Sequence, residues 1–211
     1  MCAIFGSFNK NTFMELAQLN SYRGQHSFSI SIYDPLIKGI QVLAKKEGEF
    51  EISSLKQITG AGFYFIGHIQ APTTDAKTID YIHPSTINDT RLWHNGIIKE
   101  DCIEMMQEKL GDTSPWDTHL LHRWINSARS LNDIDGTFSC LNYDKGVLYL
   151  FRNEISPMYW DDELNISSTR FPGSSKTSPN TLLEMDLTDK RLIKIGSFTT
   201  KENPYYFEFG A

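Results

Sequence analysis

The chain has 211 residues, enough for one large domain or two small ones, and it is long enough to bury a substantial core. Its formal net charge of −6 argues against wholesale binding to nucleic-acid phosphates, which requires a basic surface. No stretch approaches the ~20 apolar residues of a transmembrane helix, and the start of the chain lacks the pattern of a signal peptide. We therefore expect a protein that binds neither nucleic acid directly nor a membrane.

The predicted elements are mostly strands. In the first half of the chain we expect a helix at 11–24 and strands at 2–8, 27–34, 38–46, 62–73 and 90–94. In the second half we expect helices at 101–111 and 116–131, then strands at 136–144, 146–154, 157–162, 164–169, 181–187 and 191–198. Many strands with few helices, and no linker or repeat, predict a single α+β domain over 1–211 with mostly antiparallel sheets.

Three segments carry more specific expectations. Asn95-Gly96 follows a strand and is a dipeptide that suits a tight turn with positive backbone angles. The Gly-, Pro- and Ser-rich segment 171–180 is expected to be a loop. The aromatic tail 205–209 is expected either to pack on its own domain or to form a docking surface for a partner.

Three cysteines, Cys2, Cys102 and Cys140, are odd in number and widely spaced. This pattern predicts neither a disulfide framework nor a Cys-x-x-Cys metal site. Free thiols suit a reducing compartment, so we expect a cytoplasmic protein. No cofactor is implied, and His119 and His122, three residues apart on one helix face, lack nearby ligands that would complete a metal site.

Cys2 stands directly after the initiator Met1. If Met1 is removed, Cys2 carries both a thiol and a free α-amino group, whose reference pKa is about 7.7–8.0. That amine can accept the thiol proton, and the thiolate is the competent nucleophile. Cys2 taken alone leaves two interpretations open: a small apolar residue in a first strand, or an amino-terminal cysteine nucleophile.

Five further stretches accompany Cys2 in a fixed order. They are YRGQHS (22–27), GHIQAPTT (67–74), HNGIIKE (94–100), WDTHLL (116–121) and FRNEISPMYW (151–160). Together with the start MCAIFG they resemble the class II glutamine amidotransferase domain, the glutaminase of the amino-terminal-nucleophile (Ntn) hydrolase superfamily. The resemblance spans roughly residues 2–170. It implies a four-layer αββα sandwich of two mostly antiparallel sheets between helical layers, with Cys2 at a strand end between the sheets.

The resemblance implies a catalytic set of Cys2, Asn95 and Gly96. Hydrolysis of an amide through Cys2 needs an oxyanion hole, and a side-chain amide beside a backbone N–H is suited to that task. The alternative for Asn95-Gly96 is a plain hairpin turn.

Besides Gln70, three further residues are implied to bind substrate or order the site. Asp117 is expected to hold the substrate α-ammonium group, although a helix cap is the alternative. Thr73 is expected to hydrogen-bond the bound glutamine, unless it is a turn residue. Arg23 is expected to order the loop near Cys2, unless it is a solvated surface arginine.

Gln70 is the main departure from the family pattern. The resemblance places an arginine there, paired with the substrate α-carboxylate, whereas Gln70 can offer only weaker neutral hydrogen bonds. Either another cation reaches the carboxylate, or glutamine binds weakly, or the substrate is a different amide.

The resemblance thus implies a glutaminase that supplies ammonia to a synthase, with no cofactor. No synthase domain is expected within 211 residues, so the synthase would be a separate partner subunit. Two alternatives stay open. One is a stand-alone amidohydrolase acting on γ-glutamyl or other amides, and the other is a catalytically silent regulatory module of the same fold.

Overall fold

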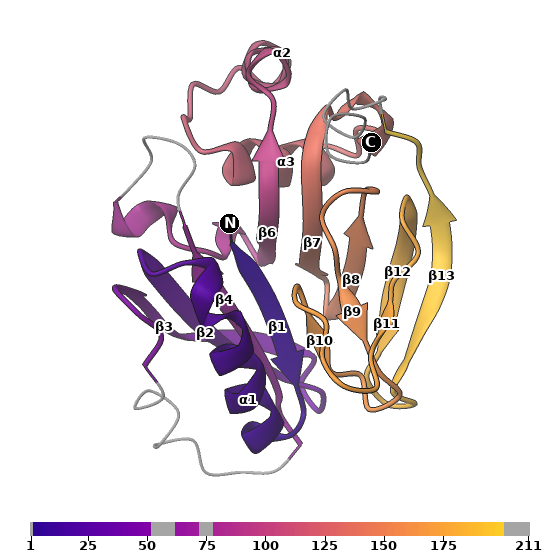
Figure 1. Cartoon of the computed structure of the whole chain (residues 1–211). Helices are drawn as coiled ribbons and strands as arrows, with labels where there is room; N and C mark the ends of the chain where they lie inside the picture. Colours follow the sequence, from indigo (N-terminus) through magenta and orange to yellow (C-terminus); the bar gives the residue numbers. More distant parts are fainter. Residues whose placement is uncertain (1, 52–61, 72–77, 201–211) are drawn as a thin grey trace, which may run out of the picture.

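The computed structural model describes residues 2–51, 62–71 and 78–200, which form two antiparallel sheets with helices on their outer faces (Figure 1). The first sheet has seven strands in the order β11 (Ser175–Lys176), β9 (Tyr159–Trp160), β10 (Ile166–Ser167), β1 (Ala3–Ser7), β4 (Tyr64–Gln70), β2 (Ser27–Asp34) and β3 (Gly39–Glu47). The second has six in the order β13 (Arg191–Ser197), β12 (Thr181–Asp186), β8 (Val147–Arg152), β7 (Gly136–Asp144), β6 (Thr90–Ile98) and β5 (Ser85–Ile87).

The described ranges hold three α-helices and three short 3-10 turns. The α-helices are α1 (Lys10–Asn20), α2 (Glu100–Leu110) and α3 (Asp117–Asn126), and the turns are η1 (Ser21–Arg23), η3 (Ile79–Tyr81) and η4 (Leu131–Asp133). Asn9 caps α1, because its side-chain oxygen accepts hydrogen bonds from the N–H groups of Asn11 and Thr12. Gly111 ends α2 in the left-handed conformation (φ 60°) that favours glycine.

Three apolar clusters show how the layers stack. On β1 alternate side chains leave opposite faces, so that Ala3 and Phe5 pack towards α1 while Ile4 points between the two sheets. On β7 Phe138 and Cys140 pack beneath α2 and α3, while Leu141 and Tyr143 point between the sheets. The four-layer sandwich expected from the resemblance is thereby confirmed.

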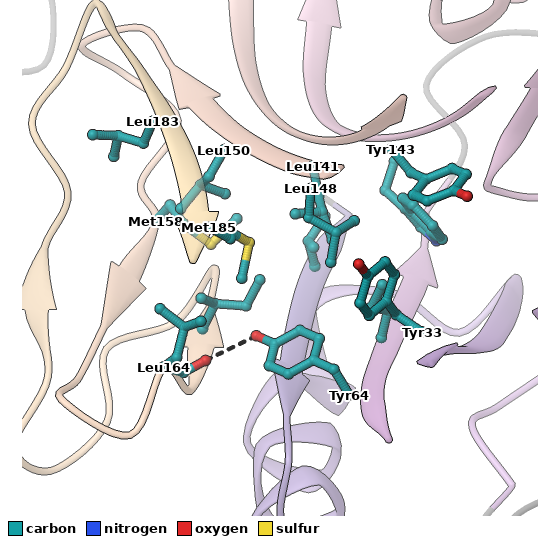
Figure 2. Close-up of a cluster of buried hydrophobic side chains, with 14 residues drawn as sticks. Tyr33, Tyr64, Leu141, Tyr143, Leu148, Leu150, Met158, Leu164, Leu183 and Met185 are labelled. Atoms are coloured by element: carbon teal, nitrogen blue, oxygen red, sulfur yellow. Dashed lines mark hydrogen bonds between the residues drawn. The ribbon is translucent and has the colours of Figure 1, made fainter. Parts of the chain in front are cut away.

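The core between the sheets draws side chains from both of them (Figure 2). Tyr33 and Tyr64 of the first sheet lie in one cluster with Leu148 and Leu150 of the second. The Tyr64 hydroxyl donates to the Leu164 carbonyl at 2.8 Å, so the polar end of this buried ring is satisfied. This packing sets the distance between the two sheets. Cys2 lies between them, directly before the first residue of β1.

Asn95-Gly96 does not form the expected turn. Both residues lie within β6, where Asn95 pairs with Ser139 and Gly96 with Phe138 of β7. The glycine is required by a close approach instead, since a Cβ at Gly96 would lie 1.9 Å from the Thr137 carbonyl oxygen. Pairing with β7 therefore overrides the local turn preference.

Other boundaries also differ from expectation. The helix expected at 11–24 ends at Asn20 and gives way to η1. The strands expected at 157–162 and 164–169 shrink to β9 and β10, and the loop expected at 171–180 contains the short strand β11. Thr73 and the aromatic tail 205–209 lie outside the described residues.

Candidate active site

Cys2 lies just before β1 and its side chain is buried, with 8% of the residue exposed. It stands two residues before Ile4, so its side chain leaves the same face of the chain and points between the sheets. The thiol donates to the Ala71 carbonyl, with Sγ 3.5 Å from the oxygen. The start of β1 lies against β6 of the other sheet (Figure 1).

Asn95 reaches the same space from β6. It lies two residues after Trp93, which belongs to the core between the sheets. Its side-chain amide donates to Ser168 Oγ at 3.3 Å, and that oxygen also accepts the N–H of Ile4 at 3.0 Å. The Ser168 hydroxyl thus joins Asn95 of one sheet to the strand that carries Cys2 in the other. No sequence motif pointed to Ser168, which lies in the segment 164–169 that was predicted only as a strand.

Gly96 presents a backbone N–H beside the Asn95 side chain. The residue opposite it, Phe138, donates its N–H to Asn153 Oδ1 at 3.2 Å and accepts the Asn153 N–H at 3.0 Å. These bonds turn the backbone groups of Phe138 towards β8, so the N–H of Gly96 points away from β7. Asn95 and Gly96 can therefore both offer donors on the open side of β6.

Arg23 holds the backbone of Cys2. Its Nε donates to the Cys2 carbonyl at 2.9 Å. The next residue, Gly24, packs directly on β4, since a Cβ there would lie 2.5 Å from the Gln70 carbonyl carbon. This close approach brings the turn after α1 beside the start of β1, where Arg23 is expected to order the site.

Asp117 is the first residue of α3 and is buried, with 5% exposed. Its Oδ1 accepts the N–H of Thr118 at 2.7 Å, as expected for a carboxylate at a helix amino terminus. Its Oδ2 accepts a long bond from the Ile98 N–H at 3.5 Å and lies 3.9 Å from His94 Nδ1. Oδ2 therefore keeps capacity to accept a further hydrogen bond.

Gln70 is buried and its amide is engaged within the protein. Its Oε1 accepts from Ser27 Oγ at 3.2 Å and lies 3.3 Å from His83 Nδ1, and its Nε2 donates to the Tyr81 carbonyl at 3.1 Å. These partners come from β2, the η3 turn and the segment before β5. They hold the side chain in one orientation against the wall of the sandwich.

A buried network connects Gln70 to Asp117. His83 Nε2 and His94 Nδ1 each lie 3.1 Å from the Thr118 hydroxyl, which follows Asp117 in α3. His68 stacks on His83 with ring centroids 3.8 Å apart, and its Nε2 lies 3.0 Å from the His94 carbonyl. Sequence reasoning missed this network because its members are 68, 83, 94 and 118, far apart in the chain.

Burial keeps these histidines uncharged. It lowers the pKa of His68 to about 3 and the pKa of His83 well below its ordinary value. The pKa of His94 is also lowered by burial, although the neighbouring Asp117 carboxylate opposes that effect. The wall beside the candidate site is therefore polar without being cationic.

The Cys2 thiol is held in its protonated form when the chain begins at Met1. Burial raises the pKa of the thiol to about 11, and the Asp117 carboxylate adds to the rise, while the amino-terminal charge and Arg23 oppose it. A thiol with this pKa is about one part in ten thousand thiolate at pH 7. Reactivity consequently requires a base close to the sulfur.

Comparison with solved structures finds the same arrangement of sheets and helices elsewhere. Glutamine phosphoribosylpyrophosphate amidotransferase from B. subtilis, complexed with ADP and GMP, matches with a TM-score of 0.67 at 15% identity, over 92% of this chain and 49% of that one. This chain has the fold of a glutamine amidotransferase. A structure described as the allosteric regulatory enzyme of purine biosynthesis matches with a TM-score of 0.64 and the same identity and coverage.

The chain spans about half the length of these two amidotransferase-fold structures. No protein-family model and no curated protein sequence matches it. Within the amidotransferase fold of this chain, the predicted residues Cys2, Arg23, Asn95 and Gly96 converge where β1 meets β6. Asp117 is close enough for its charge to act on the Cys2 thiol.

The side chains of His119 and His122 do not point to a common site. His122 lies 3.1 Å from Ser85 Oγ and 2.8 Å from Thr90 Oγ1, whereas His119 lies 3.3 Å from the Asp112 carboxylate. Among residues 2–51, 62–71 and 78–200, no group of three His, Cys, Asp or Glu side chains is placed to hold a metal ion. In the same ranges no helix is long and apolar enough to cross a membrane.

Proposed function

We propose that the protein hydrolyses the side-chain amide of glutamine or a glutaminyl compound, with Cys2 as the amino-terminal nucleophile. The observation that carries this proposal is the junction at Ser168. It places Asn95 of one sheet against the strand of Cys2 in the other, with the Gly96 N–H beside it. The proposed nucleophile and the two proposed oxyanion donors would thereby face the same space between the sheets.

The proposed reaction begins after removal of Met1. The Cys2 thiol passes its proton to its own α-amine, and the sulfur forms a bond to the amide carbon. The Asn95 side chain and the Gly96 N–H stabilise the oxygen that gains negative charge, a contribution of about 3–4 kcal/mol per donor. The C–N bond breaks, and the amine returns the proton to the leaving nitrogen, which departs as ammonia.

Water then completes the cycle. It attacks the γ-glutamyl thioester with the α-amine as base, releasing the carboxylic acid and restoring the thiol. Arg23 holds the Cys2 carbonyl during both steps, and Asp117 binds the substrate ammonium group. Thr73 is the last residue of the proposed substrate site, where it would hydrogen-bond the bound glutamine.

The test is release of ammonia from a panel of glutamine side-chain amides. We expect release by the natural chain and its loss in Cys2→Ala. A matched control is Cys102→Ala, which removes a thiol on the buried face of α2 and should retain activity. Equal ammonia release by the Cys2→Ala variant would contradict the proposal.

A catalytically silent module is the second candidate. It is favoured by the burial of Cys2, which raises the pKa of its thiol to about 11 in the chain that begins at Met1. This candidate predicts that Met1 is retained and that no amide in the panel is hydrolysed.

We further propose that released ammonia is used by a separate synthase subunit in the cytoplasm, and that residues 1–211 act as one domain. Co-purification with an ATP-dependent enzyme that forms amides or amidines would support this. A protein that purifies alone and hydrolyses amides at full rate would favour the stand-alone amidohydrolase.

A further inference from the structure

The groups around Cys2 differ in charge, and the difference bears on which substrate fits. Asp117 is buried, and its negative charge adds to the rise that burial causes in the pKa of the Cys2 thiol and of the Cys140 thiol on β7. Its Oδ1 accepts the N–H of Thr118, whereas Oδ2 accepts only a long bond from the Ile98 N–H at 3.5 Å and lies 3.9 Å from His94 Nδ1 among the described residues. Asp117 can therefore attract a positively charged substrate group.

The side of the site formed by β4 is neutral. Gln70 directly precedes Ala71, whose carbonyl accepts a hydrogen bond from the Cys2 thiol. The Gln70 amide already has three protein partners, so it has little capacity left for a ligand. His68 and His83 behind it are buried and uncharged.

Arg23 and Lys45 are cations of the described ranges beside these groups, and both have protein partners. Arg23 donates to the Cys2 carbonyl, and its charge affects the thiol less than that of Asp117 does. Lys45 donates to the Pro84 carbonyl at 2.8 Å and lines a cavity of about 270 Å³ with Tyr81 and Trp116. Among the charged side chains of the described ranges, Asp117 acts on the Cys2 thiol more strongly than Arg23 does, whereas the amino-terminal charge opposes Asp117.

We propose that the substrate is a glutaminyl amide with a free α-ammonium group and a blocked α-carboxyl group, such as an amino-terminal glutamine of a peptide. An α-carboxylate would meet the negative field of Asp117 and a neutral wall at Gln70. An ammonium group would be attracted by the same carboxylate. This inference rests on the proposed function, because it names the substrate of the same site.

Three compounds test the inference with the full chain. L-Glutamine has both charges, L-glutaminamide lacks the carboxylate, and N-acetyl-L-glutamine lacks the ammonium group. We expect kcat/KM for ammonia release to be about tenfold higher for glutaminamide than for glutamine, and lowest for N-acetylglutamine. A kcat/KM for glutamine equal to or above that for glutaminamide would overturn the inference while leaving the proposed function intact.

A charge-neutral variant checks the cause. In Asp117→Asn the preference for glutaminamide over glutamine should fall several-fold, because the repelling charge is gone. Asp112→Asn is the matched control, since Asp112 pairs with Arg123 and His119 and is not part of the proposed site. An unchanged preference in Asp117→Asn would overturn the electrostatic account. Absence of Cys2-dependent ammonia release from all three compounds would instead overturn the proposed function itself.

Discussion

At the scale of single residues, two hydroxyl groups between the sheets have opposite surroundings. Ser168 Oγ accepts hydrogen bonds from Ile4 and Asn95. Ser139 Oγ is equally buried and has no partner among the described residues. Burial without a partner is unfavourable, so the two serines should respond differently to removal of the hydroxyl.

We expect Ser168→Ala to lower the free energy of unfolding by about 1–3 kcal/mol, because it leaves the Ile4 N–H and the Asn95 amide without an acceptor. It should also lower kcat, since Asn95 loses its orientation. Ser139→Ala should be neutral or stabilising. Urea unfolding measures both, and an equal loss of stability in the two variants would contradict the assigned contacts.

The Cys2 thiol should report its burial through its reactivity. With Met1 retained, alkylation by iodoacetamide should rise about tenfold per pH unit up to pH 10 or above, because the thiol pKa is about 11 and only the thiolate reacts. Removal of Met1 should speed alkylation at pH 8. A plateau below pH 9 in the chain that keeps Met1 would be inconsistent with the buried position.

At the scale of elements, Gly96 shows where local preference and tertiary structure disagree. Gly96→Ala should lower the free energy of unfolding by about 2–3 kcal/mol or more, because its Cβ would overlap the Thr137 carbonyl. Gly111→Ala is the comparison: it also lies at positive φ, but in open space, and should cost only about 1 kcal/mol. Similar losses in urea unfolding would argue against the tight approach of β6 and β7.

Much of the element order could be read from the sequence. Apolar patterning predicted strands at 27–34 and 136–144, and these ranges are the observed bounds of β2 and β7. The sequence predicted a turn at Asn95-Gly96, whereas β6 continues through both residues. This could not be predicted, because only their pairing with residues 137–139 shows that the strand continues. The link from Gln70 through His83 to Thr118 was likewise inaccessible, since no local pattern reports contacts over such separations.

At the scale of the whole molecule, buried neutral histidines should make stability depend on pH. Burial lowers the pKa of His68 and His122 to about 3, against an ordinary value of 6.5. The unfolded chain therefore binds more protons below pH 6.5, and the free energy of unfolding falls as pH falls from 6.5 towards 3. Above pH 6.5 this contribution is fully present.

We expect the urea midpoint to drop between pH 7 and pH 5. His122→Gln should make the drop smaller, by up to about 1.4 kcal/mol per pH unit. His122 contacts Ser85 and Thr90, away from Cys2, so amide hydrolysis should be retained. A midpoint that does not change over this range would show that these histidines are not buried in the neutral form.

The most direct measurement is the intact mass of the purified protein before and after treatment with a diazoketone analogue of glutamine. The analogue is presented both as the free acid and as the α-amide. The account predicts that the mass of Met1 is missing and that one adduct forms, mapped to Cys2, absent in Cys2→Ala and retained in Cys102→Ala. Retention of Met1 without any adduct would contradict an amino-terminal cysteine nucleophile.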